Sequence, residues 1–151
     1  MTKGAGECQI VAIEPRPIAI IREAVPMDKL PEAQRRLRAK LRAALPGLEA
    51  GPYGDWLTLW RPPVAGVMEL APGVLCARAF TSADLVESAD LPEGRAAYLM
   101  AAGGYEGIPA AWGKLFGWCK AEGVALAGLN WEIYHEEAGA EPRTEFFALV
   151  V

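Results

Sequence analysis

Four segments in the second half of this chain decide its fold: RAAYLMA (95–101), PAAWGKLFGWCKAE (109–122), NWEIY (130–134) and RTEFFALV (143–150). The first, third and fourth predict strands, in which successive side chains point to opposite faces. The second predicts a helix that begins at Pro109 and ends near Glu122, before Gly123. Its large apolar residues recur at i, i+3, i+4 and i+7, the spacing of a buried helical stripe: Trp112, Leu115, Phe116 and Cys119.

The first half repeats this order of elements. Residues 9–25, which two prolines interrupt, predict a bent or edge strand. A helix should follow from Pro31 to about Leu45, with Asp28 as its N-cap and Pro46-Gly47 as its stop. The remaining expected segments are a strand at 56–60, a strand at 64–70, and a link at 74–91 that holds one or two more strands.

Two successive strand-helix-strand-strand units predict an α+β fold. We expect duplicated βαββ units that form an antiparallel sheet, with two helices on one side and a central ligand cleft. One domain should span residues 1–151, with pseudo-repeats at about 8–80 and 92–151.

The composition predicts a globular cytoplasmic protein. The 151 residues are 52% hydrophobic and 23% charged, which is too apolar for a disordered chain. No apolar run reaches the roughly 18 residues of a membrane span, and the polar segment 1–9 lacks a signal-peptide core. Three widely spaced cysteines and a single histidine, His135, favour free thiols and predict neither a metal site nor a cofactor.

Positive charge is concentrated in one predicted helix. Residues 31–45 carry five cations against one acid, Glu32, and therefore a net charge of +4, whereas the whole chain carries −4. A basic helix is a feature of nucleic-acid-binding proteins. Leucines at 37, 41 and 45 give this helix an apolar side, so its cations more often form a solvated outer face. We therefore expect no direct contact with nucleic acid and none with a membrane.

Glu132 is the most conspicuous polar residue of the predicted strands. It follows Trp131 in an apolar segment, and a buried carboxylate is costly unless it is paired. Strand alternation places Glu132 and Tyr134 on one face, with Trp131 on the other. Two interpretations remain open from the residues alone: Glu132 forms an ion pair with Arg143 or Arg95, or it holds a ligand.

Five short motifs, in this order and spacing, resemble the GyrI-like small-molecule-binding family: LPEGR (91–95), GGY (103–105), AWGKL (111–115), WEIY (131–134) and RTEFF (143–147). The family also supplies the effector-binding domains of multidrug-responsive transcription regulators. The resemblance is close in the second half and loose in the first. It implies a duplicated βαββ fold and an aromatic pocket with a buried Glu that attracts lipophilic cations.

Carried onto this chain, the resemblance places the pocket carboxylate at Glu132, its neighbour at Tyr134, and an aromatic of the final strand at Phe147 on the same face. Glu132 and Tyr134 are also the candidate catalytic residues. Further aromatic residues are candidate ligand contacts: Trp56, Trp60, Tyr98, Tyr105 and Trp112. Strand aromatics are more often plain core, and Trp112 lies on the apolar stripe of its helix.

Three functions remain open at this stage. The first is a stand-alone protein that binds drug-like, aromatic or cationic molecules in xenobiotic or antibiotic resistance. The second is a hydrolase that opens the cyclopropane ring of DNA-alkylating natural products. Glu132 would be its general base, and desolvation between aromatic walls would raise the pKa of that carboxyl. The third is a protein-interaction module such as a gyrase inhibitor. The partners expected are a small aromatic ligand and, as an option, a second copy in a homodimer.

Overall fold

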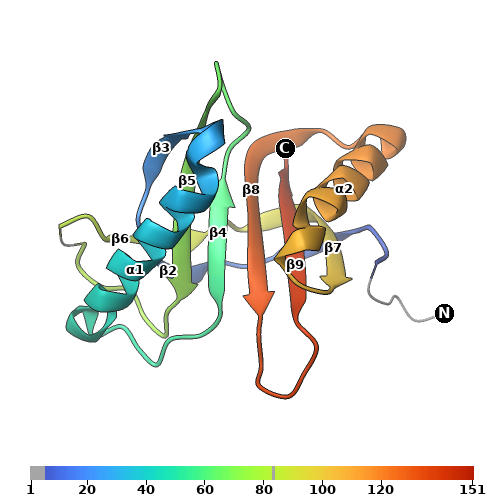
Figure 1. The fold of residues 1–151 in the computed structure, drawn as a ribbon. Helices are drawn as coiled ribbons and strands as arrows, with labels where there is room; N and C mark the ends of the chain where they lie inside the picture. The colour runs from blue at the N-terminus through green and yellow to red at the C-terminus, as the bar shows by residue number, and fades with distance from the viewer. Residues whose placement is uncertain (1–5, 83) are drawn as a thin grey trace. The chain divides into compact units, whose positions relative to one another are not determined.

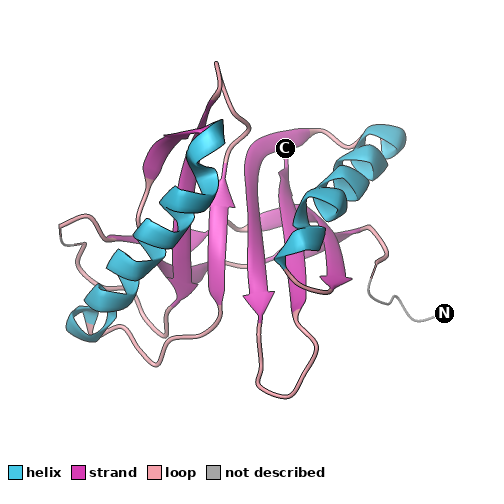
Figure 2. Ribbon diagram, in the orientation of Figure 1, coloured by secondary structure: helices cyan, strands magenta, loops and turns pink. Residues whose placement is uncertain are grey.

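The computed structural model describes residues 6–82 and 84–151. The first five residues of the polar N-terminal segment, and residue 83 of the expected link, lie outside the described residues. The described chain divides into two compact units (Figure 1): unit 1 comprises residues 6–13 and 93–151, and unit 2 comprises residues 14–82 and 84–92. Each unit combines one long helix with antiparallel strands (Figure 2). The predicted α+β class is therefore confirmed, while the central ligand cleft stays a prediction.

Unit 1 is an antiparallel sheet with helix α2 across one face. Its strands follow the order β1-β7-β9-β8. The elements are β1 (Gln9–Ile13), β7 (Gly94–Ala102), α2 (Ile108–Glu122), β8 (Leu126–His135) and β9 (Arg143–Val150). The predicted helix and strands of the second half are confirmed, with β8 longer at both ends. Helix α2 ends where Gly123 adopts a left-handed φ of 70° and its N–H closes the last turn.

The register of unit 1 defines its two faces. Phe146 lies opposite Leu99 on β7 and Glu132 on β8. All three point toward α2, since the indole ring of Trp112 contacts Phe146 edge-on at 5.2 Å. The neighbouring row, in which Phe147 pairs with Tyr98 and Trp131, points the other way.

Unit 2 also consists of antiparallel strands, and it carries helix α1. The strand order is β4-β5-β2-β6, and β3 also pairs with β5. The elements are β2 (Arg16–Ile20), β3 (Glu23–Pro26), α1 (Leu30–Leu48), β4 (Trp56–Trp60), β5 (Val67–Leu75) and β6 (Glu87–Leu91). Along one edge of β5, β3 pairs with residues 67–70 and β2 with residues 73–75. Between them the N–H of Ile21 donates to the carbonyl of Pro72, at 3.1 Å.

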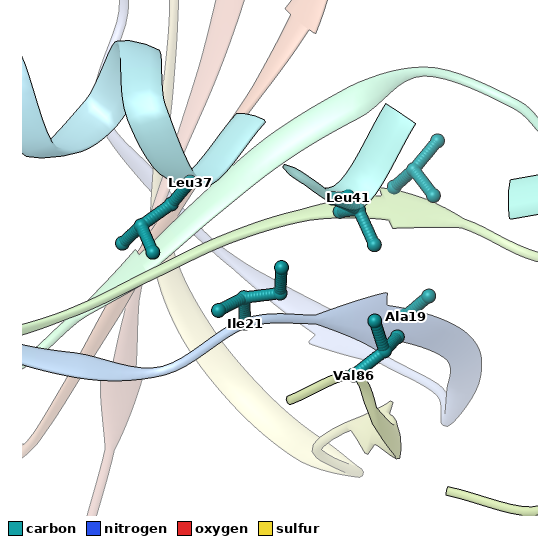
Figure 3. Packing of buried hydrophobic residues seen from close by; sticks show 6 residues of the cluster. Ala19, Ile21, Leu37, Leu41 and Val86 are labelled. Atoms are coloured by element: carbon teal, nitrogen blue, oxygen red, sulfur yellow. The ribbon is translucent and has the colours of Figure 1, made fainter. Parts of the chain in front are cut away.

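A leucine stripe of α1 forms the core of unit 2. Leu37 and Leu41, which are 1% and 0% exposed, pack onto Ile21 and Val86 in one buried cluster (Figure 3). Burial of a large aliphatic side chain contributes about 1.5–3 kcal/mol to stability. Helix α1 is thus held to its sheet by the apolar side that the sequence predicts.

Several expected boundaries in the first half are wrong. The segment 9–25 forms three short strands, and the first, β1, joins the sheet of unit 1. Helix α1 runs through Pro46-Gly47 to Leu48, because a proline this close to the end removes only one of the last helical hydrogen bonds. Asp28 lies in a short 3₁₀ turn before α1 and is not its N-cap. The strand expected at 64–70 spans 67–75.

Over the described residues, neither helix contains an apolar stretch long enough for a membrane crossing.

We expect Gly73→Ala to lower the free energy of unfolding by about 1–3 kcal/mol. A Cβ at Gly73 would lie 2.6 Å from Cγ2 of Ile20 and 2.7 Å from the carbonyl oxygen of Ala19, a backbone atom that cannot rotate away. Gly113→Ala in α2 is the matched control, because its Cβ would meet nothing within 4 Å. The control should be neutral or stabilising by up to about 1 kcal/mol. Urea unfolding that finds both variants equally stable would contradict this account of the sheet.

Candidate functional site

The candidate site is built around the buried carboxylate of Glu132. The residue is 8% exposed, and each carboxylate oxygen accepts a hydrogen bond from an aromatic side chain. The indole Nε1–H of Trp112 donates to Oε2 at 2.6 Å, and the hydroxyl of Tyr134 donates to Oε1 at 2.8 Å. The carboxylate predicted to need partners therefore accepts hydrogen bonds from both of these side chains.

Local structure brings these three side chains together. Glu132 and Tyr134 lie two positions apart on β8, so strand alternation places their side chains next to each other on the same face. Trp112 lies in the second turn of α2 and reaches the strand because its ring packs edge-on against Phe146, the partner of Glu132 on β9. Phe116, one helical turn later, stacks on Trp112 at 5.2 Å. The helix stripe and the strand alternation thus converge on one carboxylate.

The electrostatics of Glu132 combine two opposing effects. Burial disfavours the charged carboxylate, whereas both hydrogen-bond donors favour it. A buried carboxylate of this kind is suited to bind a cationic ligand, or a ligand that donates a hydrogen bond to it.

Tyr105 extends the site toward solvent. Its ring contacts that of Tyr134 edge-on at 5.5 Å, and its hydroxyl donates to Glu136. Tyr105 is 50% exposed, whereas Tyr134 is 5% exposed. A row of aromatic rings therefore leads from the surface to the carboxylate of Glu132.

Two predicted contacts, Tyr98 and Phe147, lie on the opposite face of the same sheet. The expectation that Phe147 shares a face with Glu132 is wrong, because Phe147 pairs with Trp131 and stacks on it at 5.3 Å. Tyr98 packs edge-on against Phe147 at 5.1 Å. Arg143 pairs with His135 and shares this opposite face, so it does not form the ion pair with Glu132 that the sequence left open.

The opposite face carries its own polar network. The hydroxyl of Tyr98 donates to Oε2 of Glu145 at 2.6 Å, and the imidazole Nε2 of His135 lies 2.6 Å from Oε1 of the same carboxylate. Burial and the bond to Glu145 raise the pKa of Tyr98 above its ordinary value. The phenol therefore stays protonated and acts as a donor within the network.

The two remaining candidates, Trp56 and Trp60, belong to unit 2. The guanidinium groups of Arg38 and Arg42 lie over the Trp56 ring, 5.5 and 5.1 Å from its centroid. Such cation–π contacts orient both arginines on the same indole. Trp60 packs against an apolar cluster of β3, α1 and β5 that includes Val25 and Met68.

Sequence reasoning missed the pairing of Trp112 with Glu132. The helical stripe correctly predicts that Trp112 is buried, at 7% exposure. A buried indole also needs an acceptor for its N–H, and Glu132 is the charged acceptor on the facing strand. That requirement was the signal for the contact. Over residues 6–82 and 84–151, no group of three His, Cys, Asp or Glu side chains is arranged to hold a metal ion.

We expect Trp112→Phe to destabilise the protein by about 1.5–3 kcal/mol, because it removes a hydrogen bond to a buried charge. Trp118→Phe on the same helix makes the same chemical change at a half-buried position and should cost less than about 1 kcal/mol. The W112F/E132Q double variant should be more stable than additivity predicts, since a neutral amide tolerates the lost donor better. Thermal or urea unfolding measures all four proteins, and strict additivity would contradict the coupling.

Comparisons with known proteins agree with this architecture. The C-terminal domain of EcmrR has a TM-score of 0.74 at 18% sequence identity, covering 96% of this chain and 97% of that one. SAV2435, solved bound to tetraphenylphosphonium, has a TM-score of 0.72 at 16% identity, covering 96% and 94%. A hydrolase from Listeria innocua has a TM-score of 0.61 at 12% identity, covering 99% and 94%. At these identities the likeness shows the fold alone.

A search of curated proteins found no match. The model of the GyrI-like small molecule binding domain matches residues 6–147, nearly the whole chain. This chain therefore belongs to the GyrI-like small-molecule-binding domain family.

Proposed function

We propose that the protein binds a cationic aromatic small molecule at the Glu132 face of unit 1. The observation that carries this proposal is the buried carboxylate of Glu132, which accepts hydrogen bonds from the aromatic side chains of Trp112 and Tyr134. A carboxylate in an apolar setting has lost its contact with water, and attraction to a bound cation offsets that cost. A cation without hydrogen-bond donors, such as a phosphonium, is the easiest to bring there because it is weakly hydrated.

Aromatic rings supply the rest of the binding energy. Tyr105 and Tyr134 lie edge to face beside the carboxylate, and a cation over a tyrosine ring gains about 0.5–2 kcal/mol. Tyr105 is half exposed and can cover a bound ligand or turn aside with little cost to the core. The proposed ligand is therefore flat or multi-ringed, with one delocalised positive charge.

The comparisons support the same ligand class. SAV2435, which has the same fold, was solved with tetraphenylphosphonium, a lipophilic aromatic cation. We infer that this protein sequesters such compounds and lowers their free concentration, a role in xenobiotic or antibiotic resistance. A cytoplasmic location and a homodimer stay predictions from the sequence.

A hydrolase is the second candidate, and the hydrogen bond from Tyr134 to Glu132 favours it. In this reaction the carboxylate takes a proton from water, whose oxygen attacks a cyclopropane carbon. The C–C bond breaks, and its electrons pass to a conjugated carbonyl oxygen. Once Glu132 carries the proton, the Tyr134 hydroxyl would turn from Oε1 and donate the hydrogen bond that stabilises this oxygen. The proton held by Glu132 is then given up to that oxygen, which forms the phenol and restores the carboxylate. One protein of the same fold is described as a hydrolase.

We expect Glu132→Gln to weaken tetraphenylphosphonium binding by about tenfold or more, measured by isothermal titration calorimetry. Glutamine is nearly isosteric: its carbonyl can accept from Trp112, and its amide can donate to the Tyr134 hydroxyl, so the variant tests charge. Glu141→Gln, at an exposed position, is the matched control and should bind as the unaltered protein does. Neutral triphenylphosphine oxide should bind both variants equally. Equal phosphonium affinity for both variants would contradict the role of Glu132.

The hydrolase candidate predicts that a duocarmycin-type cyclopropane compound gains the mass of one water in the presence of the protein. Mass spectrometry should find about 10²–10⁴-fold less product with Glu132→Gln, the usual loss for a general base. Tyr134→Phe should give a smaller loss. Compound that returns unchanged from the unaltered protein would remove the hydrolase and leave binding as the function.

A further inference from the structure

Unit 2 contains a groove that the function proposed above does not use. It has a volume of about 570 Å³, within the range of small-molecule sites. One wall is the second half of α1, and the other is the segment Asp84–Val86 that precedes β6. We propose that this groove binds an amphipathic anion, with its apolar body between the walls and a single anionic head group on Lys40.

Small residues on α1 create the hollow. Ala43, Ala44 and Gly47 line the groove where larger side chains would fill it. A Cβ placed on Gly47 would meet no atom within 4 Å. Leu48 closes the same wall at the end of the helix. The groove therefore has room for a ring or an alkyl chain beside the helix.

The floor of the groove is apolar and buried. Ile21 and Val86 line it and are also members of the buried cluster under α1, at 3% and 6% exposure (Figure 3). Leu85 stands on the facing wall with 63% of its surface exposed. Covering an exposed leucine against an apolar ligand removes that surface from water, which favours binding.

The positive charge beside the groove favours a ligand with an anionic head group. Lys40 is the cationic residue among those that line the groove, and it is exposed. It belongs to a helix that carries five cations against Glu32. Arg36 of this helix is bound by Glu23 and Glu32. An incoming anion at Lys40 therefore meets a positive field from α1 that these carboxylates only partly neutralise.

Asp84 limits the ligand to one anionic group. Its carboxylate lies on the wall that faces α1, where it disfavours a second negative charge and disfavours an anion bound in the reverse direction. A ligand with one carboxylate, sulfonate or phosphate at the Lys40 end pairs with Lys40 and keeps its negative charge away from Asp84. This preference is opposite in sign to that of the Glu132 face of unit 1.

The test is a fluorescence titration with 8-anilinonaphthalene-1-sulfonate, an aromatic anion, at low ionic strength. Lys40→Glu should weaken dye binding about fivefold to tenfold, because an exposed ion pair is replaced by a like-charge pair. Arg35→Glu makes the same change of charge on the same helix at an exposed position outside the groove and should stay within about twofold. Asp84→Asn, which tolerates the left-handed φ of 52° at this position, should tighten binding.

A steric variant tests the place of binding. Ala43 is exposed and lines the groove, so Ala43→Trp fills the groove without disturbing the core and should reduce dye affinity at least tenfold. Unchanged affinity in Ala43→Trp would overturn the proposal, because the dye would then bind elsewhere. Equal losses in Lys40→Glu and Arg35→Glu would also overturn it, by showing attraction to the whole helix.

Cross-titration separates this site from that of Glu132. Lys40→Glu and Ala43→Trp should bind tetraphenylphosphonium as the unaltered protein does, which also shows that they are folded. Glu132→Gln should bind the anionic dye normally. Loss of dye binding in Glu132→Gln would overturn the proposal by placing the dye in unit 1. If the phosphonium fails to bind the unaltered protein, the function proposed for Glu132 fails, and melting temperature then reports the folding of the groove variants.

Discussion

Burial of the Glu132 carboxylate is the constraint on which unit 1 depends. A charge that is 8% exposed must be met by donors. The two that meet it come from different elements: Tyr134 from β8 itself, and Trp112 from α2. The helix can present its indole only if it lies across Phe146 at the observed position. One polar requirement therefore fixes both the placement of α2 and the direction in which β8 faces.

In unit 2 the contact between helix and sheet is apolar. Helix α1 is held by Leu37 and Leu41 on an apolar floor, and its cations remain on the outside or lie over Trp56. The chain thus repeats one order of elements with two kinds of interface. Unit 1 concentrates a negative charge under its helix, and unit 2 spreads positive charge over the outside of its helix. The two units of this fold therefore differ in the sign of the charge that their helices carry or cover.

The second half of the fold was predictable because its signals are local. The stripe of α2, the glycine after it and the alternation of β9 all lie within single segments, and their elements are confirmed. Helix α1 was harder, since Pro46 is a strong stop signal whose cost is small this near a helix end. The strands before α1 were divided by tertiary pairing: β1 joins the C-terminal strands, which no local pattern indicates.

The site was predictable in part for the same reason. Alternation within β8 correctly placed Glu132 beside Tyr134, because both residues belong to one strand. The face of Phe147 depended on the register between β8 and β9, which pairs it with Trp131. A shift of one residue reverses every side chain of a strand, so a family pattern alone could not decide it. The bond from Trp112 joins a helix to a strand 20 residues away and required the fold.

Pro72 has a consequence for how unit 2 assembles. Its carbonyl accepts from Ile21 at the point where β5 changes partner from β3 to β2. The imino nitrogen faces the same edge and has no hydrogen to offer. If the β2–β3 segment were shifted by two residues along β5, one of its backbone carbonyls would face this nitrogen and find no hydrogen-bond donor. Pro72 therefore favours the observed register of β2 and β3 on β5 over a register shifted by two residues.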